Sequence, residues 1–236
     1  MTTVEPIGED TLPIPPLEER ESVEQRVAGI LRDLIVVGRL RAGTPLVHRE
    51  LAAKLGVSPT PVRAGLGQLE REGLVDVSPT GRAFVSRLTR EDFEEIYAAR
   101  FGLEGLAARL GAPRVDAAGL ELMRGLLVEL RDLASRRDID RYLALRWEYH
   151  ATCYRSGGRA RLVDEVERLY RRSERYNRLV LATPERFRES VDRYREFLAA
   201  CESHDGEAAE RVIHQAMRWA VDRVAPTLPA ETEHGG

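Results

Sequence analysis

Residues 51–74 read LAAKLGVSPTPVRAGLGQLEREGL, and this stretch contains two short apolar series separated by a break at Gly56-Val57-Ser58. The apolar residues recur at helical spacing on both sides of the break: Leu51 and Leu55 before it, then Val62, Leu66 and Leu69. Two short helices joined by a Gly-containing turn are typical of a helix-turn-helix. Ser58 suits the N-cap of the second helix, because its hydroxyl can accept a bond from an otherwise unpaired backbone N–H. The alternative is an ordinary helical hairpin, in which the LxxxLGV pattern also occurs.

The first turn of the second helix carries Thr60 and Arg63 on its exposed side. Such side chains bond phosphates and the edges of bases in the major groove. The stretch therefore favours double-stranded DNA as a partner.

The segment that follows, LVDVSPTGRAFVSRL, has the pattern of a β-hairpin. Val75 and Val77 alternate with polar residues, and Pro79-Thr80-Gly81 supplies turn chemistry. A helix-turn-helix followed by a two-stranded ribbon is a winged helix. Its predicted tip, Gly81 and Arg82, could reach a neighbouring groove.

Over roughly residues 21–88 the chain resembles the GntR family of bacterial transcription regulators. The resemblance is carried by Gly43, Leu46, Arg49-Glu50-Leu51-Ala52, Leu55-Gly56-Val57-Ser58, Thr60-Pro61-Val62-Arg63, Leu66, Leu69-Glu70, Glu72-Gly73-Leu74-Val75 and Gly81. It implies a DNA-binding surface made of Arg49, Ser58, Thr60, Pro61, Arg63, Gly81 and Arg82. The chain departs from the family at Pro59, where Arg is common, and at Ala64-Gly65, where Glu-Ala is common.

The charge of the chain is divided unevenly along its length. The net charge of the 236 residues is −3, yet residues 20–90 contain twelve Lys and Arg against seven Asp and Glu. An excess of +5 on the proposed DNA module is what phosphate neutralisation requires.

Length and pattern predict two folded parts. Residues 1–19 are acidic and proline-rich and are expected to be a disordered tail. We expect a DNA-binding domain over 20–88, an all-helical domain over 89–226 and a second tail over 227–236. Thr89 should cap the first helix of the second domain. The helices predicted there cover 90–111, 115–135, 138–156, 159–181, 184–204 and 206–225.

The helical half resembles the FCD effector domain of the FadR-type branch of the same family. The matching residues are Tyr97, Arg100, Leu103-Glu104, Ala107-Ala108, Leu110, Tyr149-His150, Leu198, Ala200, Asp205 and Ala209. The resulting fold class is mainly α: a winged helix-turn-helix followed by an all-α antiparallel bundle. The resemblance also implies a small-molecule effector, a homodimer formed through these domains and repression that the ligand relieves at a near-palindromic operator.

Many FCD domains hold a divalent metal with one Asp and three His from facing helices. In this chain the Asp position holds Arg146, His150 is kept, and the other two His positions hold Tyr194 and Ala216. His214 lies two residues from Ala216, about 200° around the helix, and should face elsewhere. We therefore expect no metal and no other cofactor.

Arg146 and His150 are four residues apart and share one face of a helix. A permanently charged guanidinium near the lost metal could hold a carboxylate or phosphate. The hypothesis is a metal-free effector site made of Arg100, Arg146, His150 and Tyr194. The alternative is that Arg146 pairs with a neighbouring carboxylate such as Glu104, which would leave the cavity collapsed or apolar.

Other classes of protein find little support in the sequence. Neither a Gly-rich phosphate loop nor an HExxH, GxSxG or CxxC motif occurs, so an enzyme is not expected. Cys153 and Cys201 lie in apolar helical patterns and are predicted to be buried thiols. With neither a long apolar run nor a signal peptide, the protein is expected in the cytoplasm without a membrane partner. Two alternatives stay open: an effector-independent DNA-binding protein, and a metal-dependent helical domain fused to a DNA module.

Overall fold

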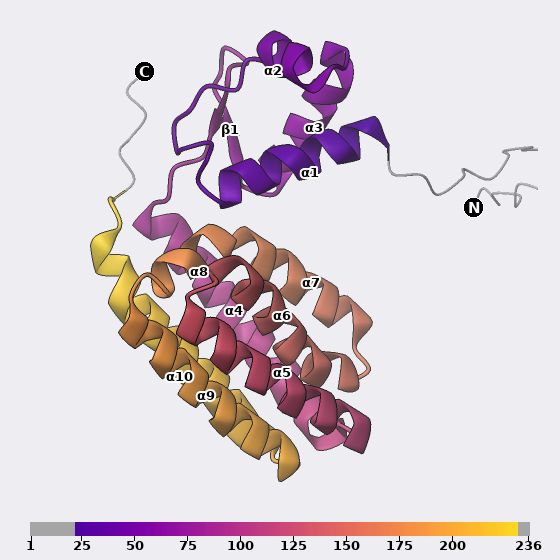
Figure 1. Cartoon of the computed structure of the whole chain (residues 1–236), viewed down its shortest axis with the longest axis vertical. Helices are drawn as coiled ribbons and strands as arrows, with labels where there is room; N and C mark the ends of the chain where they lie inside the picture. The colour runs from indigo at the N-terminus through magenta and orange to yellow at the C-terminus, as the bar shows by residue number, and fades with distance from the viewer. Residues whose placement is uncertain (1–21, 231–236) are drawn as a thin grey trace, which may run out of the picture.

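A computed structural model describes residues 22–230, and these form a small winged helix-turn-helix seated on a larger bundle of helices (Figure 1). The tails expected at 1–19 and 227–236 lie outside this range, except for residues 227–230. The first part comprises α1 (Val23–Val36), α2 (His48–Leu55), α3 (Pro59–Arg71), β1 (Val75–Val77) and β2 (Ala83–Val85). The bundle comprises α4 (Arg90–Gly111), α5 (Ala117–Arg136), α6 (Ile139–Ser156), α7 (Ala160–Arg172), α8 (Glu174–Val180), α9 (Pro184–Glu202) and α10 (Gly206–Val224), with the 3₁₀ turns η1 (Ala112–Arg114) and η2 (Ala225–Thr227). The predicted fold class is confirmed.

The winged helix folds around its own apolar core. The buried side chains come from all three helices and both strands: Val27, Leu31 and Ile35 of α1, Ala52 of α2, Val62, Leu66 and Leu69 of α3, and Val75, Ala83 and Val85 of the hairpin. The two strands pair antiparallel with Asp76 opposite Phe84. A single antiparallel bridge between Pro45 and Phe84 joins the segment before α2 to the hairpin.

The helix-turn-helix is shaped by its turn residues. Gly56 ends α2 with φ +65°, a left-handed conformation that glycine adopts without steric cost. Ser58 occupies the N-cap of α3 as predicted, but its hydroxyl makes no capping hydrogen bond. Pro59 at the first helical position fits there because its missing N–H would be unpaired in any case.

Gly65 lets α3 approach α1 closely. A Cβ at this position would lie 3.1 Å from the carbonyl oxygen of Glu24 and from Cγ1 of Val27. The departure from the family's Ala therefore coincides with a tight helix crossing.

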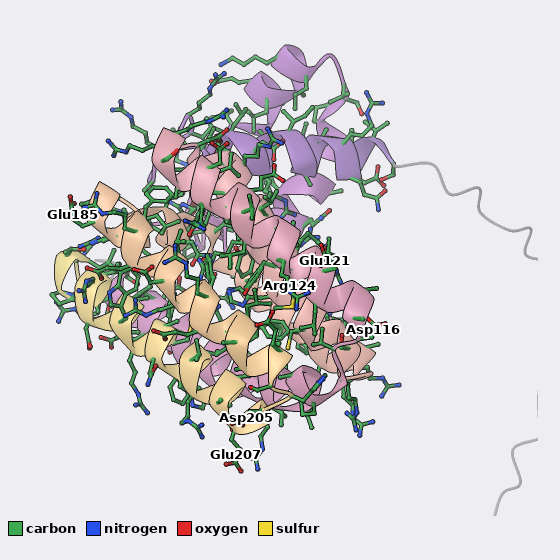
Figure 2. The ribbon with its side chains drawn as sticks, turned by 60° about the horizontal axis from the view of Figure 1, so that its bottom comes forward. Asp116, Glu121, Arg124, Glu185, Asp205 and Glu207 are labelled. Carbon is green, nitrogen blue, oxygen red and sulfur yellow. The ribbon has the colours of Figure 1, made fainter. Side chains whose placement is uncertain are left out.

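The bundle is organised around α4, which packs against α6, α7 and α10. Side-chain oxygens cap its long helices: Thr89 accepts from Asp92 N, Asp116 from Gly119 N, Asp138 from Arg141 N, Thr183 from Arg186 N and Asp205 from Ala208 N. Asp116 and Asp205 mark the starts of α5 and α10 in Figure 2. Each cap satisfies a backbone donor that the helix itself leaves free.

The single helix predicted over 159–181 is instead two helices, α7 and α8, separated at Ser173. Ser173 is fully buried, and its hydroxyl donates to Tyr170 O at 2.7 Å. The same oxygen accepts from Arg100 Nη1 at 3.0 Å and from Asn177 Nδ2 at 3.1 Å. The Ser173 hydroxyl thus bonds both the preceding turn and the guanidinium of Arg100, and this explains why the helix is interrupted here.

Both cysteines are buried free thiols, as predicted. Within the described residues, no helix combines the length and apolar character needed to cross a bilayer.

Replacing Gly111 with Ala should destabilise the bundle by roughly 3 kcal/mol, the upper end of the usual cost of overpacking. An added Cβ would lie 2.1 Å from the carbonyl oxygen of Cys153, so α4 and α6 would have to separate. Urea unfolding followed by tryptophan fluorescence measures the change, since Trp147 and Trp219 both lie in the bundle. Gly125→Ala is the matched control: its Cβ meets nothing within 4 Å, so it should be neutral or up to about 1 kcal/mol stabilising. Equal effects of the two variants would contradict the close-approach explanation.

Candidate nucleic-acid interface and buried cavity

The start of α3 presents polar side chains to solvent. Thr60 and Arg63 are exposed, and Pro61 between them is half-buried. Buried Val62 and Leu66 hold the opposite face of α3 in the core. Anchoring one face in this way leaves Thr60 and Arg63 free to meet a partner.

Arg49 and the tip of the wing add further basic groups. Arg49 is exposed at the start of α2, and Gly81 and Arg82 are exposed between the two strands. Gly81 has φ +77°, and the turn is closed by a bond of 2.9 Å from Ser78 N to Arg82 O. Among residues 22–230, none of the guanidinium groups of Arg49, Arg63 and Arg82 has a hydrogen bond or an ion pair. Unpaired arginines on one module provide the charge that phosphates require.

The bundle encloses a small cavity of about 30 Å³ between α4, α6, α9 and α10. Its polar lining consists of Tyr97, Glu104, Arg146, His150, Ser190, Arg193 and Tyr194, and its apolar lining of Val180, Ile213, Ala216, Met217, Trp219 and Ala220. Three of the four predicted effector residues, Arg146, His150 and Tyr194, thus lie around one space. This volume accommodates a water molecule and nothing larger.

Arg100, the fourth predicted residue, lies behind the wall and does not line the cavity. It is fully buried, and its Nε donates to Glu104 Oε1 at 2.6 Å. Its Nη1 donates to Ser173 and Asn177, while Nη2 has no partner among the described residues. Burial is the largest single influence and acts to lower the pKa of Arg100, but the charge and hydrogen bond of Glu104 together with Tyr97 leave the pKa raised. Glu104 therefore pairs with Arg100, and the alternative pairing with Arg146 is wrong.

Arg146 has no carboxylate partner in the described part of the chain. Its guanidinium lies over the ring of Tyr170 at 5.6 Å, and its buried Nε makes no hydrogen bond. Arg100 lies over the same ring at 5.4 Å. Both guanidinium groups thus lie over the ring of Tyr170, and of the two only Arg100 forms an ion pair with an acid.

His150 faces the same cavity with an unpartnered nitrogen. Only 7% of the residue is exposed, and Nδ1 has no hydrogen bond within residues 22–230. Burial, followed by the charges of Arg146 and Arg100, holds the pKa of His150 well below its usual value. The imidazole is therefore neutral at neutral pH, able to donate one hydrogen bond and accept one.

Tyr194 completes the polar wall opposite α6. Its hydroxyl accepts from Ser190 Oγ at 3.0 Å, and its backbone carbonyl accepts from Tyr149 OH at 2.6 Å. Its ring lies 5.2 Å from that of His150. These contacts fix the side chain beside the imidazole.

The metal that the FCD resemblance implies does not fit this cavity. The ligand positions hold a guanidinium at Arg146, a phenol at Tyr194 and a methyl group at Ala216, all of which line it. Nowhere in residues 22–230 do three His, Cys, Asp or Glu side chains gather as a metal would need. His214 points away as predicted, since it stacks on Phe101 at 3.7 Å and bonds the carbonyl of that residue.

Sequence reasoning missed Arg193, Ser190 and Trp219 as cavity residues. Arg193 lies over the ring of Trp219 at 4.8 Å, and Trp219 is 9% exposed. The only signal in the sequence is the spacing of Ser190 and Tyr194, which are four residues apart and therefore share one face of α9.

The short helix α8 contacts both the cavity region and the winged helix. Arg175 Nη1 donates to the carbonyl oxygen and the hydroxyl of Ser86 at 3.0 and 2.9 Å, and Ser86 Oγ donates to Gly73 O. Tyr176 OH donates to Asp92 at 2.8 Å. These bonds hold the end of the wing and the start of α4.

The opposite face of α8 packs toward Tyr97 and Arg100 of α4. Asn177 Oδ1 accepts from Tyr97 OH at 3.0 Å and from Arg100 Nη1 at 3.4 Å, and Val180 lines the cavity. The seven residues of α8 therefore connect the wall of the cavity with the winged helix.

Comparison with known proteins places both halves. Residues 23–85 match the family described as bacterial regulatory proteins of the gntR family, and residues 95–218 match the FCD domain. The chain is 32% identical to an uncharacterised HTH-type transcriptional regulator of Streptomyces ambofaciens, over 82% of this chain and 81% of the relative. It is 29% identical to a probable D-xylose utilization operon transcriptional repressor of Paenarthrobacter nicotinovorans, over 89% and 91% of the two chains. The solved structure of E. coli McbR/YncC shares the fold, with a TM-score of 0.73 and 23% identity over 87% of this chain and 98% of that one.

Proposed function

Because the chain belongs to the GntR family of bacterial transcription regulators and carries its FCD domain, we propose that it is a sequence-specific repressor released from DNA by a small anionic effector. It would act in the cytoplasm as a homodimer on a near-palindromic operator, without catalysis. We divide the chain accordingly into a DNA-binding domain over 20–88 and an effector-binding and dimerisation domain over 89–226.

The exposed, unpaired arginines of the winged helix support the DNA-binding role. Arg63 and Thr60 at the start of α3 have the position and chemistry to read base edges in a major groove. Arg49, Ser58 and Arg82 would contact the backbone around them. Two copies in a dimer would place two α3 helices in successive major grooves.

One observation carries the effector role: unpaired polar atoms converge on one buried cavity. Arg146 Nε and His150 Nδ1 lack partners in the described structure, and both residues line the cavity with Tyr194. Buried polar groups without partners are costly, so such a cluster indicates a polar ligand. An unbalanced guanidinium favours a carboxylate or a phosphate, and we propose that Arg146 takes over the electrostatic role of the family's metal.

We propose that α8 transmits occupancy of the cavity to the wing. A ligand that displaces Val180 or Asn177 would move Arg175 away from Ser86 and release the end of β2. Grooves of about 460 and 600 Å³ lie between the winged helix and α6, α7 and α8, which leaves room for such a change. The ligand would then favour the arrangement with lower operator affinity.

The second candidate is an effector-independent DNA-binding protein. The cavity volume of about 30 Å³ favours it, because a ligand must open the cavity before it can bind.

Operator titrations separate the two candidates. A duplex selected from a random library by the wild-type protein is labelled, and its binding is followed by fluorescence anisotropy with and without citrate, glutarate or phosphate. We expect at least one anion to weaken wild-type binding by about tenfold, a coupling of about 1.4 kcal/mol. Arg146→Met should keep DNA affinity and lose the response. Arg175→Met should still be thermally stabilised by the anion but lose the effect on DNA.

Two results would contradict these assignments. Failure to select any consensus duplex would remove the sequence-specific DNA-binding role. Operator binding that none of the anions alters would favour the effector-independent protein.

A further inference from the structure

We propose that Arg193 is the lid and second anion-binding arm of the cavity, so that the site selects an effector with two negative charges. This inference rests on the proposed effector role of the cavity and narrows it to dicarboxylates and phosphate monoesters.

Arg193 lines the cavity from α9, whereas Arg146 lines it from α6. Arg193 is half-buried, and its Nη1 donates to the backbone carbonyl of Glu189 at 3.0 Å. Its guanidinium lies on the ring of Trp219, which also lines the cavity. In the described range of the chain, Arg193 has no carboxylate partner.

The acids nearest to Arg193 are engaged elsewhere or face solvent. Glu189 pairs with Arg223 at 3.2 Å and also accepts the indole N–H of Trp219. Asp192 pairs with Arg195 at 2.6 Å. Glu196, three residues further along α9, is exposed and forms no ion pair with Arg193 among residues 22–230.

A charge balance of the cavity leaves two positive charges. Arg100 is balanced by Glu104, and Arg223 by Glu189. His150 is neutral, because burial and its arginine neighbours lower its pKa, and burial raises the pKa of Tyr142 nearby. Arg146 on α6 and Arg193 on α9 both line the cavity, and neither forms an ion pair within residues 22–230. Buried charges are stabilised by opposite charges with good hydrogen-bond geometry, which a dianion between the two guanidinium groups supplies.

The position of Arg193 also explains how a ligand could enter so small a space. Arg193 is half-buried and its guanidinium lies on the ring of the buried Trp219, so Arg193 lies between the cavity and the surface. Arg193 is held there by a ring contact and one bond to a carbonyl, not by an ion pair, and its flexible side chain can swing outward. Closing again over a bound dianion would replace the ring contact with a charged hydrogen bond.

The test compares dianionic and monoanionic probes in a Trp147→Phe background, where Trp219 is the remaining tryptophan. Calorimetry and Trp219 fluorescence are followed with glutarate, succinate and phosphate, and with butyrate as the monoanion. We expect a dianion to bind at least about tenfold tighter than butyrate and to change Trp219 emission. Arg193→Met should remove this preference, with less than about threefold change for butyrate, whereas Arg146→Met should weaken both.

Arg188→Met is the matched control, because Arg188 lies on the same helix with its side chain 72% exposed. It should bind like the background protein. This inference would be overturned if both dianions and the monoanion bind in a way that depends on Arg146 but is unchanged in Arg193→Met. The proposed effector site would remain supported by that result. If none of the four probes binds, both this inference and the proposed effector site are overturned.

Discussion

Replacing Arg100 with Met is expected to destabilise the helical bundle by about 3–5 kcal/mol, the usual cost of breaking a buried ion pair. Arg100 is fully buried and Glu104 is 3% exposed, so neither charge can turn to water. The variant would leave the Glu104 carboxylate with only the hydrogen bond from Tyr154 OH at 3.1 Å. It would also remove a donor from Ser173, where α7 ends and α8 begins.

Denaturant unfolding followed by tryptophan fluorescence isolates this effect, because both tryptophans lie in the bundle. Arg124→Met is the matched control, and Arg124 is labelled in Figure 2. Its side chain is 47% exposed and pairs with Glu202 at 2.7 Å, so the variant should change stability far less. The double variant Arg100→Met with Glu104→Met should recover most of the loss, since it removes both buried charges. A loss below about 1 kcal/mol in Arg100→Met would show that the pair does not hold the bundle together.

Local chemistry explains why most helix boundaries could be predicted from the sequence. Thr89, Thr183 and Asp205 cap the helices that follow them, and these residues are strong local signals. The interruption at Ser173 could not be predicted, because it depends on Arg100, which is 73 residues away in the chain. The apolar pattern passes through Ser173 without a break.

In the candidate cavity, too, local spacing predicted some residues, whereas others depend on contacts between distant parts of the chain. The spacing of Arg146 and His150 places both on one helix face, and both line the cavity. The sequence left the partner of Glu104 open, because Arg100 and Arg146 could both reach it, and only the packing of the helices selects Arg100. Arg193 was missed because its inward position depends on Trp219, which lies on the next helix.

Arg63→Ala is expected to weaken binding of a dimer to its operator by about 2–6 kcal/mol, which corresponds to a loss between about 30-fold and about 2 × 10⁴-fold. The estimate counts about 1–3 kcal/mol for each base-reading arginine and two copies in the proposed homodimer. Arg63 is exposed near the start of α3, and the described residues offer it no intramolecular partner to compete with DNA. Its removal should therefore act on binding and leave folding unchanged. Anisotropy titrations with the selected duplex measure the loss.

Two roles of Arg63, reading a base and contacting a phosphate, can cause a similar loss of affinity in Arg63→Ala. They differ in the affinity of Arg63→Lys and in how the loss varies among DNA sequences. A base-reading arginine forms two parallel hydrogen bonds to guanine, which Lys cannot reproduce; Arg63→Lys should therefore lose most of the affinity despite keeping the charge. Selection with Arg63→Ala should then return a consensus relaxed at one base pair in each half-site. Arg211→Met, which removes an exposed charge from the far part of the bundle, should bind like wild type. A phosphate contact predicts instead that Arg63→Lys restores binding, that Arg63→Ala weakens binding equally for all sequences, and that binding of Arg63→Ala depends less on salt. In that case the bases must be read by other residues at the start of α3, such as Thr60.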